Sequence, residues 1–249
     1  MNSVRREKIL AFIEENGSAT VKQLSALFPG VSLMTLHRDL GFLEAENLIE
    51  RVRGGARRPQ SSVEPRFETR ERVNSGYKRI IAQKALLLIQ PGSAVFIDAG
   101  TTGLALARLL PDMELSVFTT GPNIALELMK LTRPSINICG GNLSRDNLAL
   151  SGRSTLEMIA GINIDTAFIG TGGYTGESGF TGGNESEAAV KALVISKART
   201  AVALTDSSKI GRILPFTFAR LADFDAVVND GRLPATFLEE AKRLNITVL

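Results

Sequence analysis

Apolar residues recur at helical spacing near the start of the chain. Ile9 and Ile13 lie on one face of a first predicted helix. Thr20 is a suitable N-cap for a second, shorter helix of sequence VKQLSALF, which Pro29 and Gly30 end. We therefore expect the N-terminal part of the chain to be a small helical bundle.

A third helix is predicted to begin after Ser32, whose hydroxyl group can cap it. Its buried face is defined by leucines at helical spacing, namely Leu33, Leu36, Leu40 and Leu43. At about 100° per residue, Arg38 points nearly opposite Leu36, with Thr35 and His37 on the two flanks. The exposed face of this helix therefore carries one arginine that is rich in hydrogen-bond donors.

A short hairpin, or wing, is predicted to follow the third helix. The segment LIERVR suggests a strand, and Gly54 and Gly55 then suggest a turn and a return strand. The whole chain has a formal net charge of only +3, but four arginines without an acidic residue between them lie here, namely Arg51, Arg53, Arg57 and Arg58. The wing is therefore expected to be strongly basic.

Three helices and a basic wing predict a DNA-binding module, because a major groove accepts one helix and contacts the residues near its N-terminus. The wing arginines would attract phosphates, and the glycines would let the backbone approach the duplex. The expected DNA contacts are Ser32, Thr35, His37, Arg38, Arg51, Arg53, Gly54, Gly55, Arg57 and Arg58. Asp39 is instead expected to pair with a neighbouring basic side chain. The alternative is a three-helix module that binds protein, with a solvated basic hairpin.

Strand and helix segments alternate beyond residue 77. Strand cores such as AVFI and AVAL lack polar alternation, which predicts a mostly parallel sheet covered on both faces. The stretch PQSSVEPRFETRERVNSG is polar, holds two prolines and is typical of a linker. The expected organisation is a helix-turn-helix domain at 1–58, a linker at 59–76 and an α/β domain at 77–249.

The predicted strands end in loops of small polar residues, DAGTTG, TTGPN, CGGN, GTGG and TDSSK. The carboxyl ends of parallel strands share one edge of a sheet, which is where open α/β folds bind ligands. The expected ligand residues are Asp98, Gly100, Thr101, Thr102, Thr119, Asn123, Gly140, Gly141, Glu187 and Lys209. For any single loop, the same composition also suits turn geometry alone, and Glu187 also suits a helix N-terminus. Together, the loops predict a small polar ligand.

The composition and the motifs exclude several kinds of site and cofactor. Cys139 and His37 are the only cysteine and histidine, so the sequence offers neither a disulfide nor a Cys/His metal site. Neither a Walker loop nor a GxGxxG fingerprint occurs, and we expect no cofactor. No apolar run reaches the roughly 18 residues of a membrane span, so we expect a cytoplasmic protein. Cys139 is expected to be a small buried residue, and Tyr174, in GGYTGESGF, to lie in a flexible lid or an exposed hairpin.

These stretches together resemble the DeoR family of bacterial transcriptional regulators over nearly the whole chain. The family's helix motif corresponds to VSLMTLHRDL, its wing to IERVRGGA, and its sensor half to DAGTT, TTGPN, GG, EA and DSSK. Two departures occur: Pro29-Gly30 adds a residue before the third helix, and His37 stands where arginine is commoner.

The resemblance implies a regulator of sugar or carbohydrate metabolism genes, normally a repressor, that binds operator DNA as a homo-oligomer, a dimer or a tetramer. It also implies a sensor domain similar to ribose-5-phosphate isomerase and CoA transferases, which binds a phosphorylated sugar or related metabolite. An active sugar-phosphate isomerase is the second hypothesis, but residues 170–173 read GTGG and lack the carboxylates of such enzymes. A sugar-phosphate-binding protein whose N-terminal module contacts protein is the third.

Overall fold

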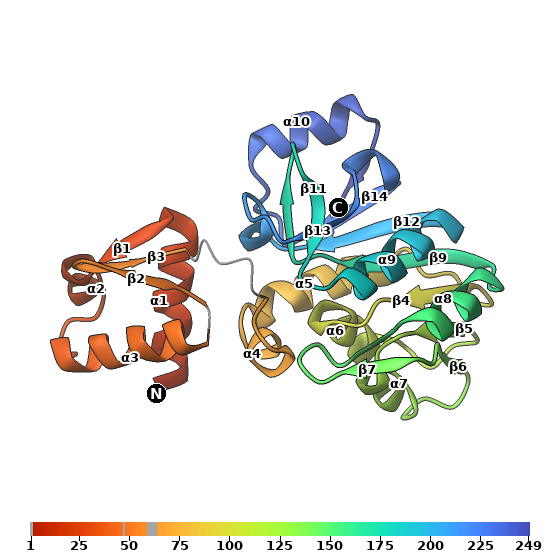
Figure 1. Ribbon diagram of the computed structural model, residues 1–249, viewed down its shortest axis with the longest axis horizontal. Helices are drawn as coiled ribbons and strands as arrows, with labels where there is room; N and C mark the ends of the chain where they lie inside the picture. Colours follow the sequence, from red (N-terminus) through yellow and green to blue (C-terminus); the bar gives the residue numbers. More distant parts are fainter. Residues whose placement is uncertain (1, 47, 59–63) are drawn as a thin grey trace. The chain divides into compact units, whose positions relative to one another are not determined.

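The computed structural model describes residues 2–46, 48–58 and 64–249. The chain divides into two compact units, Met1–Asn74 and Ser75–Leu249 (Figure 1).

Up to residue 58, the described part of the first unit contains three helices and a small antiparallel sheet. The helices are α1 (Asn2–Asn16), α2 (Val21–Leu27) and α3 (Leu33–Ala45), and the strands are β1 (Ser18–Thr20), β2 (Glu50–Val52) and β3 (Gly55–Arg57). The strands pair in the order β1-β3-β2. Thr20 and Ser32 cap α2 and α3 as expected. The helices and the wing are confirmed. Strand β1 was not predicted, because it is only three residues long.

The expected buried face of α3 is wrong at one position. Leu36, Leu40 and Leu43 are buried, but Leu33 is 57% exposed. The buried face also includes Asp39, and at about 100° per residue this moves its centre away from Leu33. Leu33 is also the first residue of the helix, so it lies on the edge of the buried face as well as at its end.

The segment expected to be a linker contains a helix, α4 (Phe67–Arg72). Residues 59–63 lie outside the described part of the chain. Beyond α4, Val73 packs against the apolar core of the first unit, and the Asn74 side chain donates to Glu14 at 3.3 Å. Residues 64–74 of the expected linker therefore belong to the first unit, and its last two residues begin the second.

The second unit begins with α5 (Ser75–Leu86) and contains a seven-stranded parallel sheet in the order β15-β14-β12-β9-β4-β5-β6. Its strands are β4 (Ala94–Ile97), β5 (Ser116–Thr119), β6 (Ser135–Ile138), β9 (Ile164–Gly170), β12 (Ala198–Thr205), β14 (Ala226–Asn229) and β15 (Thr247–Val248). Each overlaps one of the segments in which the sequence predicts a strand, namely 93–100, 115–121, 135–141, 165–173, 200–208, 224–231 and 246–249. The parallel α/β fold is confirmed.

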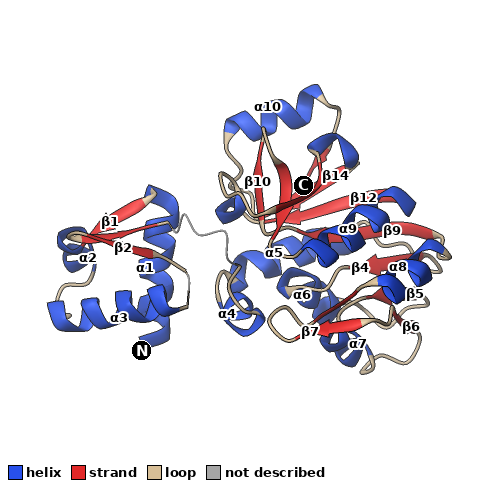
Figure 2. Cartoon of the chain, in the orientation of Figure 1, coloured by secondary structure: helices blue, strands red, loops and turns tan. Residues whose placement is uncertain are grey.

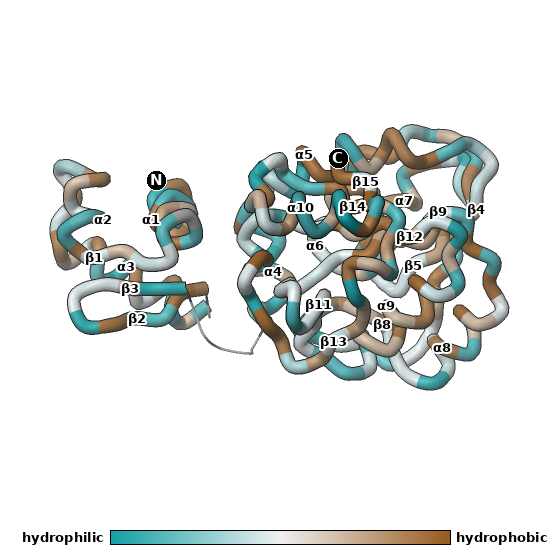
Figure 3. Tube along the Cα trace, turned by 90° about the horizontal axis from the view of Figure 1, so that it is seen from above, coloured by the Kyte–Doolittle hydropathy of each residue, from teal (hydrophilic) through white to brown (hydrophobic). Residues whose placement is uncertain are grey.

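Helices cover both faces of this sheet (Figure 2). They are α6 (Thr101–Leu109), α7 (Pro122–Leu128), α8 (Arg153–Ala160), α9 (Glu185–Lys197) and α10 (Ala235–Arg243). Phe96 of β4 belongs to an apolar cluster with residues of α8, α9 and α10, whereas the neighbouring Ile97 lies beside Gly103 of α6. Successive strand residues point to opposite faces, so α6 covers the other face. Hydrophobic stretches, brown in Figure 3, run through the interior of this unit.

The second unit also contains two smaller sheets, of which only a hairpin at GGYTGESGF was among the expectations from the sequence. One pairs β10 (Gly173–Thr175), β11 (Gly179–Gly182) and β13 (Phe216–Ala219), and the other is a hairpin of β7 (Asn142–Ser144) and β8 (Ala149–Ser151). Their strands have only three or four residues, too few for a clear apolar alternation.

Tyr174 lies in the β10–β11 hairpin, so a hairpin at GGYTGESGF is confirmed, but the side chain is buried and its expected exposure is wrong. Its ring packs against Phe180 and Phe237, with centroid distances of 4.6 and 4.9 Å. Its hydroxyl group donates to Glu240 at 2.9 Å. Burial and this contact raise the pKa of Tyr174, so the phenol stays protonated at neutral pH.

We expect Gly55→Ala to destabilise the first unit by about 2 kcal/mol or more, because its added methyl group would lie 2.1 Å from the carbonyl oxygen of Ala19 in β1. Gly41→Ala is the matched control. The methyl group there meets no atom within 4 Å, and alanine favours the helix by up to about 1 kcal/mol. Thermal unfolding followed by circular dichroism measures both. Equal midpoints would contradict the close packing of β3 on β1.

Candidate functional site

The N-terminal half of α3 presents polar groups at the surface. Ser32 caps the helix: its hydroxyl oxygen accepts a hydrogen bond from the Thr35 backbone N–H at 3.2 Å, and the two hydroxyl groups lie 2.9 Å apart. Arg38 is exposed and has no ion-pair partner among the described residues. The expected contact residues of this helix therefore share its first two turns, and Arg38 has its donors available.

A buried carboxylate fixes the orientation of α3. Asp39 has no exposed surface and accepts hydrogen bonds from Nε of Arg5 at 2.5 Å and of Arg6 at 2.8 Å, both on α1. The Arg6 guanidinium group also lies over the Phe42 ring, 3.8 Å from its centroid. The expected structural role of Asp39 is confirmed. Its two partners are residues for which the sequence offered no pairing signal beyond their charge.

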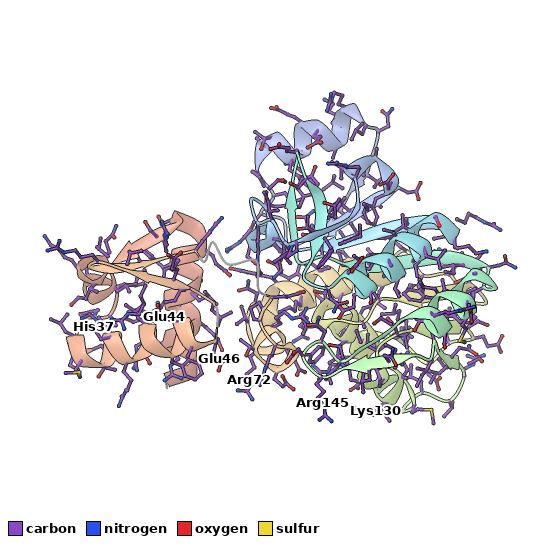
Figure 4. All side chains as sticks on the ribbon, viewed as in Figure 1. His37, Glu44, Glu46, Arg72, Lys130 and Arg145 are labelled. Atoms are coloured by element: carbon purple, nitrogen blue, oxygen red, sulfur yellow. The ribbon has the colours of Figure 1, made fainter. Side chains whose placement is uncertain are left out.

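A second set of contacts joins the wing to His37 and Glu44 of α3, both labelled in Figure 4. The Arg51 guanidinium group lies 3.4 Å from Nδ1 of His37, and the Arg51 backbone N–H donates to Glu44 at 3.2 Å. Arginine can only donate, so Nδ1 accepts, and the proton of a neutral imidazole is then on Nε2. His37 can therefore offer Nε2–H as a donor to a partner.

The four wing arginines differ in their surroundings. Arg57 forms a two-point ion pair with Glu50, with N–O distances of 2.8 and 3.1 Å, and this contact raises the pKa of Arg57. Arg53 and Arg58 are exposed and have no such partner among the described residues. Because Glu50 offsets the charge of Arg57, Arg53 and Arg58 carry more of the wing's free positive charge.

The two wing glycines also differ. Gly54 is exposed, has φ +82° and would meet no atom within 4 Å if it carried a Cβ. Gly55 is buried beneath β1. Only Gly54 is placed to bring the wing backbone close to a partner, whereas Gly55 is required for packing.

In the second unit, the direction of chain progression reverses at β4. From β4 the chain proceeds to β5 and β6 on one side, and it then crosses to β9 on the other. Ligands of open α/β sheets bind at the carboxyl ends of strands at such a reversal. Asp98 directly follows β4, and Gly170 ends β9, so both lie at this point.

A buried ion pair occupies this position. Lys191 of α9 donates to Oδ2 of Asp98 and to the Gly170 carbonyl oxygen, both at 2.6 Å, and the Gly170 N–H donates to the same carboxylate at 3.1 Å. The side chains of Asp98 and Lys191 are 5% and 12% exposed. Lys191 was not among the ligand residues expected from the sequence. Its spacing four residues after Glu187 on one helix face was the available signal.

Helix α6 begins three residues after Asp98, at the same edge. Its N-cap, Gly100, has no side chain to cap the first backbone N–H groups. Thr101 and Thr102 form its first turn, and the Gly103 Cα lies too close to the Asp98 carbonyl oxygen to carry a Cβ. Uncapped N–H groups at a helix N-terminus favour an anion.

The β7–β8 hairpin joins the neighbouring strand end to α9. Leu150 N–H donates to the Thr120 carbonyl oxygen at 2.8 Å, and the Asn147 side chain donates to Glu187 at 2.8 Å. The hairpin therefore connects the carboxyl end of β5 with the first turn of α9, and Lys191 continues that connection to Asp98. This arrangement brings Asp98, Thr101, Thr102 and Glu187 to one edge.

Two further expected ligand residues lie next to this edge. Thr119 ends β5, is buried, and accepts from the Gly121 N–H at 3.0 Å. Both side-chain polar atoms of Asn123 are buried and have no hydrogen-bond partner in the described part of the chain. An unpaired buried amide costs about 1 to 3 kcal/mol, which favours a polar partner at Asn123.

The remaining expected ligand residues are less closely connected to the edge at Asp98. Gly140 and Gly141 follow β6, two strands from β4, and a Cβ on Gly141 would lie 2.1 Å from the Thr155 hydroxyl oxygen. Lys209 follows β12, and no hydrogen bond or ion pair within the described ranges joins it to Asp98.

Cys139 is buried as expected, and burial raises its pKa to about 11, so the thiol stays protonated at neutral pH.

Residues 5–62 match the DeoR-like helix-turn-helix domain, and residues 73–231 match the DeoR C terminal sensor domain. The chain is 33% identical to a putative aga operon transcriptional repressor of Escherichia coli O157:H7, over 99% of this chain and 93% of that protein. The chain belongs to the DeoR family of transcriptional regulators.

Other transcriptional regulators are similar over nearly their whole length. The HTH-type transcriptional regulator GlpR of Haloferax volcanii is 36% identical, over 98% of this chain and 96% of that protein. The glycerol-3-phosphate regulon repressor of Escherichia coli K12 is 30% identical, over 94% and 93%. The chain is therefore a DNA-binding regulator and not the isomerase of the second hypothesis.

Solved structures show a likeness in fold alone. Ribose-5-phosphate isomerase A of Methanocaldococcus jannaschii has a TM-score of 0.41 and 17% identity, over 55% of each chain. A probable sor operon regulator from Shigella flexneri has a TM-score of 0.37 and 16% identity, over 55% of this chain and 76% of that chain.

Two further features concern the described residues only. None of their helices is long and apolar enough to span a bilayer. Nor do their His, Cys, Asp and Glu side chains form a group that could hold a metal ion.

We expect Lys191→Met to destabilise the sensor unit by about 3 to 5 kcal/mol, because it leaves the buried Asp98 carboxylate without its cation. Adding Asp98→Asn should recover part of the loss. Arg153→Met, which breaks an exposed i,i+4 pair with Glu157, is the control and should cost less than about 1 kcal/mol. Urea unfolding measures all three, and similar losses for the two single variants would contradict a buried pair.

Proposed function

We propose that this regulator represses genes of sugar or carbohydrate metabolism, and that a phosphorylated sugar or related metabolite changes its affinity for operator DNA. The exposed N-terminal half of α3 carries the proposal. There Arg38 has free donors, while the buried ion pairs of Asp39 hold the helix against α1. The relatives' names support the target class, because they include a repressor of an aga operon and one of a glycerol-3-phosphate regulon.

In this proposal, α3 enters the major groove. Arg38 and the Nε2–H of His37 would face base edges or nearby phosphates, and Ser32 and Thr35 would contact the backbone at the helix start. Arg51, Arg53, Arg58 and Gly54 would lie along the phosphates. Gly55 and Arg57 would support this surface indirectly, through β1 packing and the Glu50 ion pair.

The functional form in this proposal is a homo-oligomer in the cytoplasm, either a dimer or a tetramer. One α3 contacts only a few base pairs, and two helices related by a twofold axis would read a palindromic or repeated operator about one helical turn apart. Double-stranded operator DNA is then the macromolecular partner.

The effector would bind at the carboxyl edge between β4 and β9. Its phosphate would accept from the uncapped N–H groups of α6 and from the hydroxyl groups of Thr101 and Thr102. Glu187 and the unpaired amide of Asn123 would bind sugar hydroxyl groups. Thr119, Gly100 and the Asp98–Lys191 pair would fix the shape of the edge. The effector would bind the free protein and the DNA-bound protein with different affinities. This difference would set how far the effector changes the affinity for operator DNA.

Selection of bound fragments from a random duplex pool by the full-length protein tests this function. The selection is repeated with triose, pentose and hexose phosphates, with inorganic phosphate as a control. An enriched repeat whose binding one sugar phosphate weakens supports the proposal. Failure to enrich any sequence, even at low salt, overturns it.

Arg38→Ala is expected to weaken operator binding by about 1 to 3 kcal/mol and to relax sequence preference, because it removes donors from the groove. Arg53→Ala should weaken binding to all sequences similarly, because it removes a phosphate contact. The slope of the logarithm of the binding constant against the logarithm of the salt concentration should become shallower by about one. Fluorescence anisotropy at several salt concentrations separates the two. The assignment of α3 is wrong if Arg38→Ala binds the operator as wild type does.

Thr102→Asp is expected to raise the half-effective concentration of the sugar phosphate at least about tenfold, because its carboxylate repels the phosphate at the α6 N-terminus. An acid in a first helical turn does not disfavour the helix. Thr236→Asp is the matched control, since it occupies the same second position of α10. Operator titrations with effector measure both. An equal response from both variants would place the phosphate elsewhere.

A further inference from the structure

Two large apolar side chains lie exposed at the start of α3. Leu33 is 57% exposed and Met34 is 79% exposed, although three other leucines of the same helix are buried. The two side chains are adjacent and form a small apolar patch, and in the proposed function this patch faces the DNA groove.

Helical spacing places these side chains among the donors of α3. Met34 is four residues before Arg38 and Leu33 is four before His37, so each apolar side chain precedes a donor by about one turn on the same face. These two pairs form two rows along the helix. Gly41, in the next turn, lies between the rows, and a Cβ there would meet nothing within 4 Å. The face therefore combines two apolar groups, two donors and a position without a side chain.

The charge around this face favours a nucleic acid over an apolar protein surface. Arg38 is on the face itself, and Arg53 and Arg58 are exposed on the wing of the same unit. In the major groove, the apolar group at the base edges is the C5-methyl group of thymine. Methionine has a flexible, polarizable side chain that adapts to such a contact.

We propose that Met34 and Leu33 bind thymine C5-methyl groups in each operator half-site, next to the base or phosphate contacted by Arg38. The proposal rests on the proposed function and adds the base chemistry that α3 selects. It gives Leu33 and Met34 a role in specificity that differs from the hydrogen-bonding role of Arg38. An operator half-site should accordingly contain thymine beside the position that Arg38 reads.

The test uses the full-length protein and the operator obtained by selection. Each thymine is replaced in turn by deoxyuridine, which removes only the methyl group. Loss of one buried methyl contact should weaken wild-type binding about fourfold at one or two positions of a half-site. Met34→Ala should weaken binding to the thymine operator and respond much less to deoxyuridine at one of those positions. Leu33→Ala should do the same at another.

Val4→Ala is the matched control, because Val4 is 56% exposed on α1 of the same unit. It should retain the full deoxyuridine response. Thermal unfolding checks that the exposed substitutions leave the fold intact.

Three results would overturn the proposal. One is equal affinity of wild type for the thymine operator and for every deoxyuridine duplex. Another is a Met34→Ala loss that is the same with thymine and deoxyuridine at every position. The third is a change in oligomer mass for Met34→Ala with an unchanged deoxyuridine response, which would assign the apolar face to a second copy of the chain. If no operator is selected at all, the proposed function fails first and this inference fails with it.

Discussion

The presentation of α3 depends on a carboxylate that is fully removed from water. A buried charge is stable only when it is paired and hydrogen-bonded, so Asp39 requires both Arg5 and Arg6 of α1. This requirement connects residues more than 30 positions apart and fixes the rotation of α3 about its axis. With Asp39 directed inwards, helical geometry leaves Met34 and Arg38 on the outer face. The surface that we assign to DNA is thus a consequence of an interaction on the opposite side of the helix.

The sensor unit uses a similar interaction at its ligand edge. Lys191 joins the carboxylate after β4 to the carbonyl group that ends β9, at the point where the chain reverses its direction across the sheet. The β7–β8 hairpin continues this connection through Asn147 and Glu187. Because these residues come from separate elements, a ligand at this edge contacts several parts of the unit at once. Such a site suits a sensor, whose ligand must favour one arrangement of the protein over another.

Residue type alone does not separate binding residues from structural ones. Gly54 and Gly55 are adjacent, yet only Gly55 lies against β1. Arg53 and Arg57 are both wing arginines, yet only Arg57 has its charge offset by Glu50. Gly141 similarly belongs to a loop with a ligand-like composition, although its contact with Thr155 already excludes a side chain. Short polar loops and basic hairpins therefore contain both kinds of residue, and their neighbours in space distinguish them.

The sequence determined helices α1 to α3, the helices that alternate with the strands of the sheet, the wing and the seven parallel strands, because hydrophobic periodicity and capping residues such as Thr20 and Ser32 are local properties. It also determined that polar strand ends would share one edge, because parallel connectivity requires it. Only the tertiary structure decided that Lys191 pairs with Asp98, that Tyr174 is buried and that Leu33 is exposed. These outcomes depend on contacts between segments far apart in the chain: 93 residues separate Lys191 from Asp98, and 66 separate Tyr174 from Glu240. Local patterns carry no information about such distant partners.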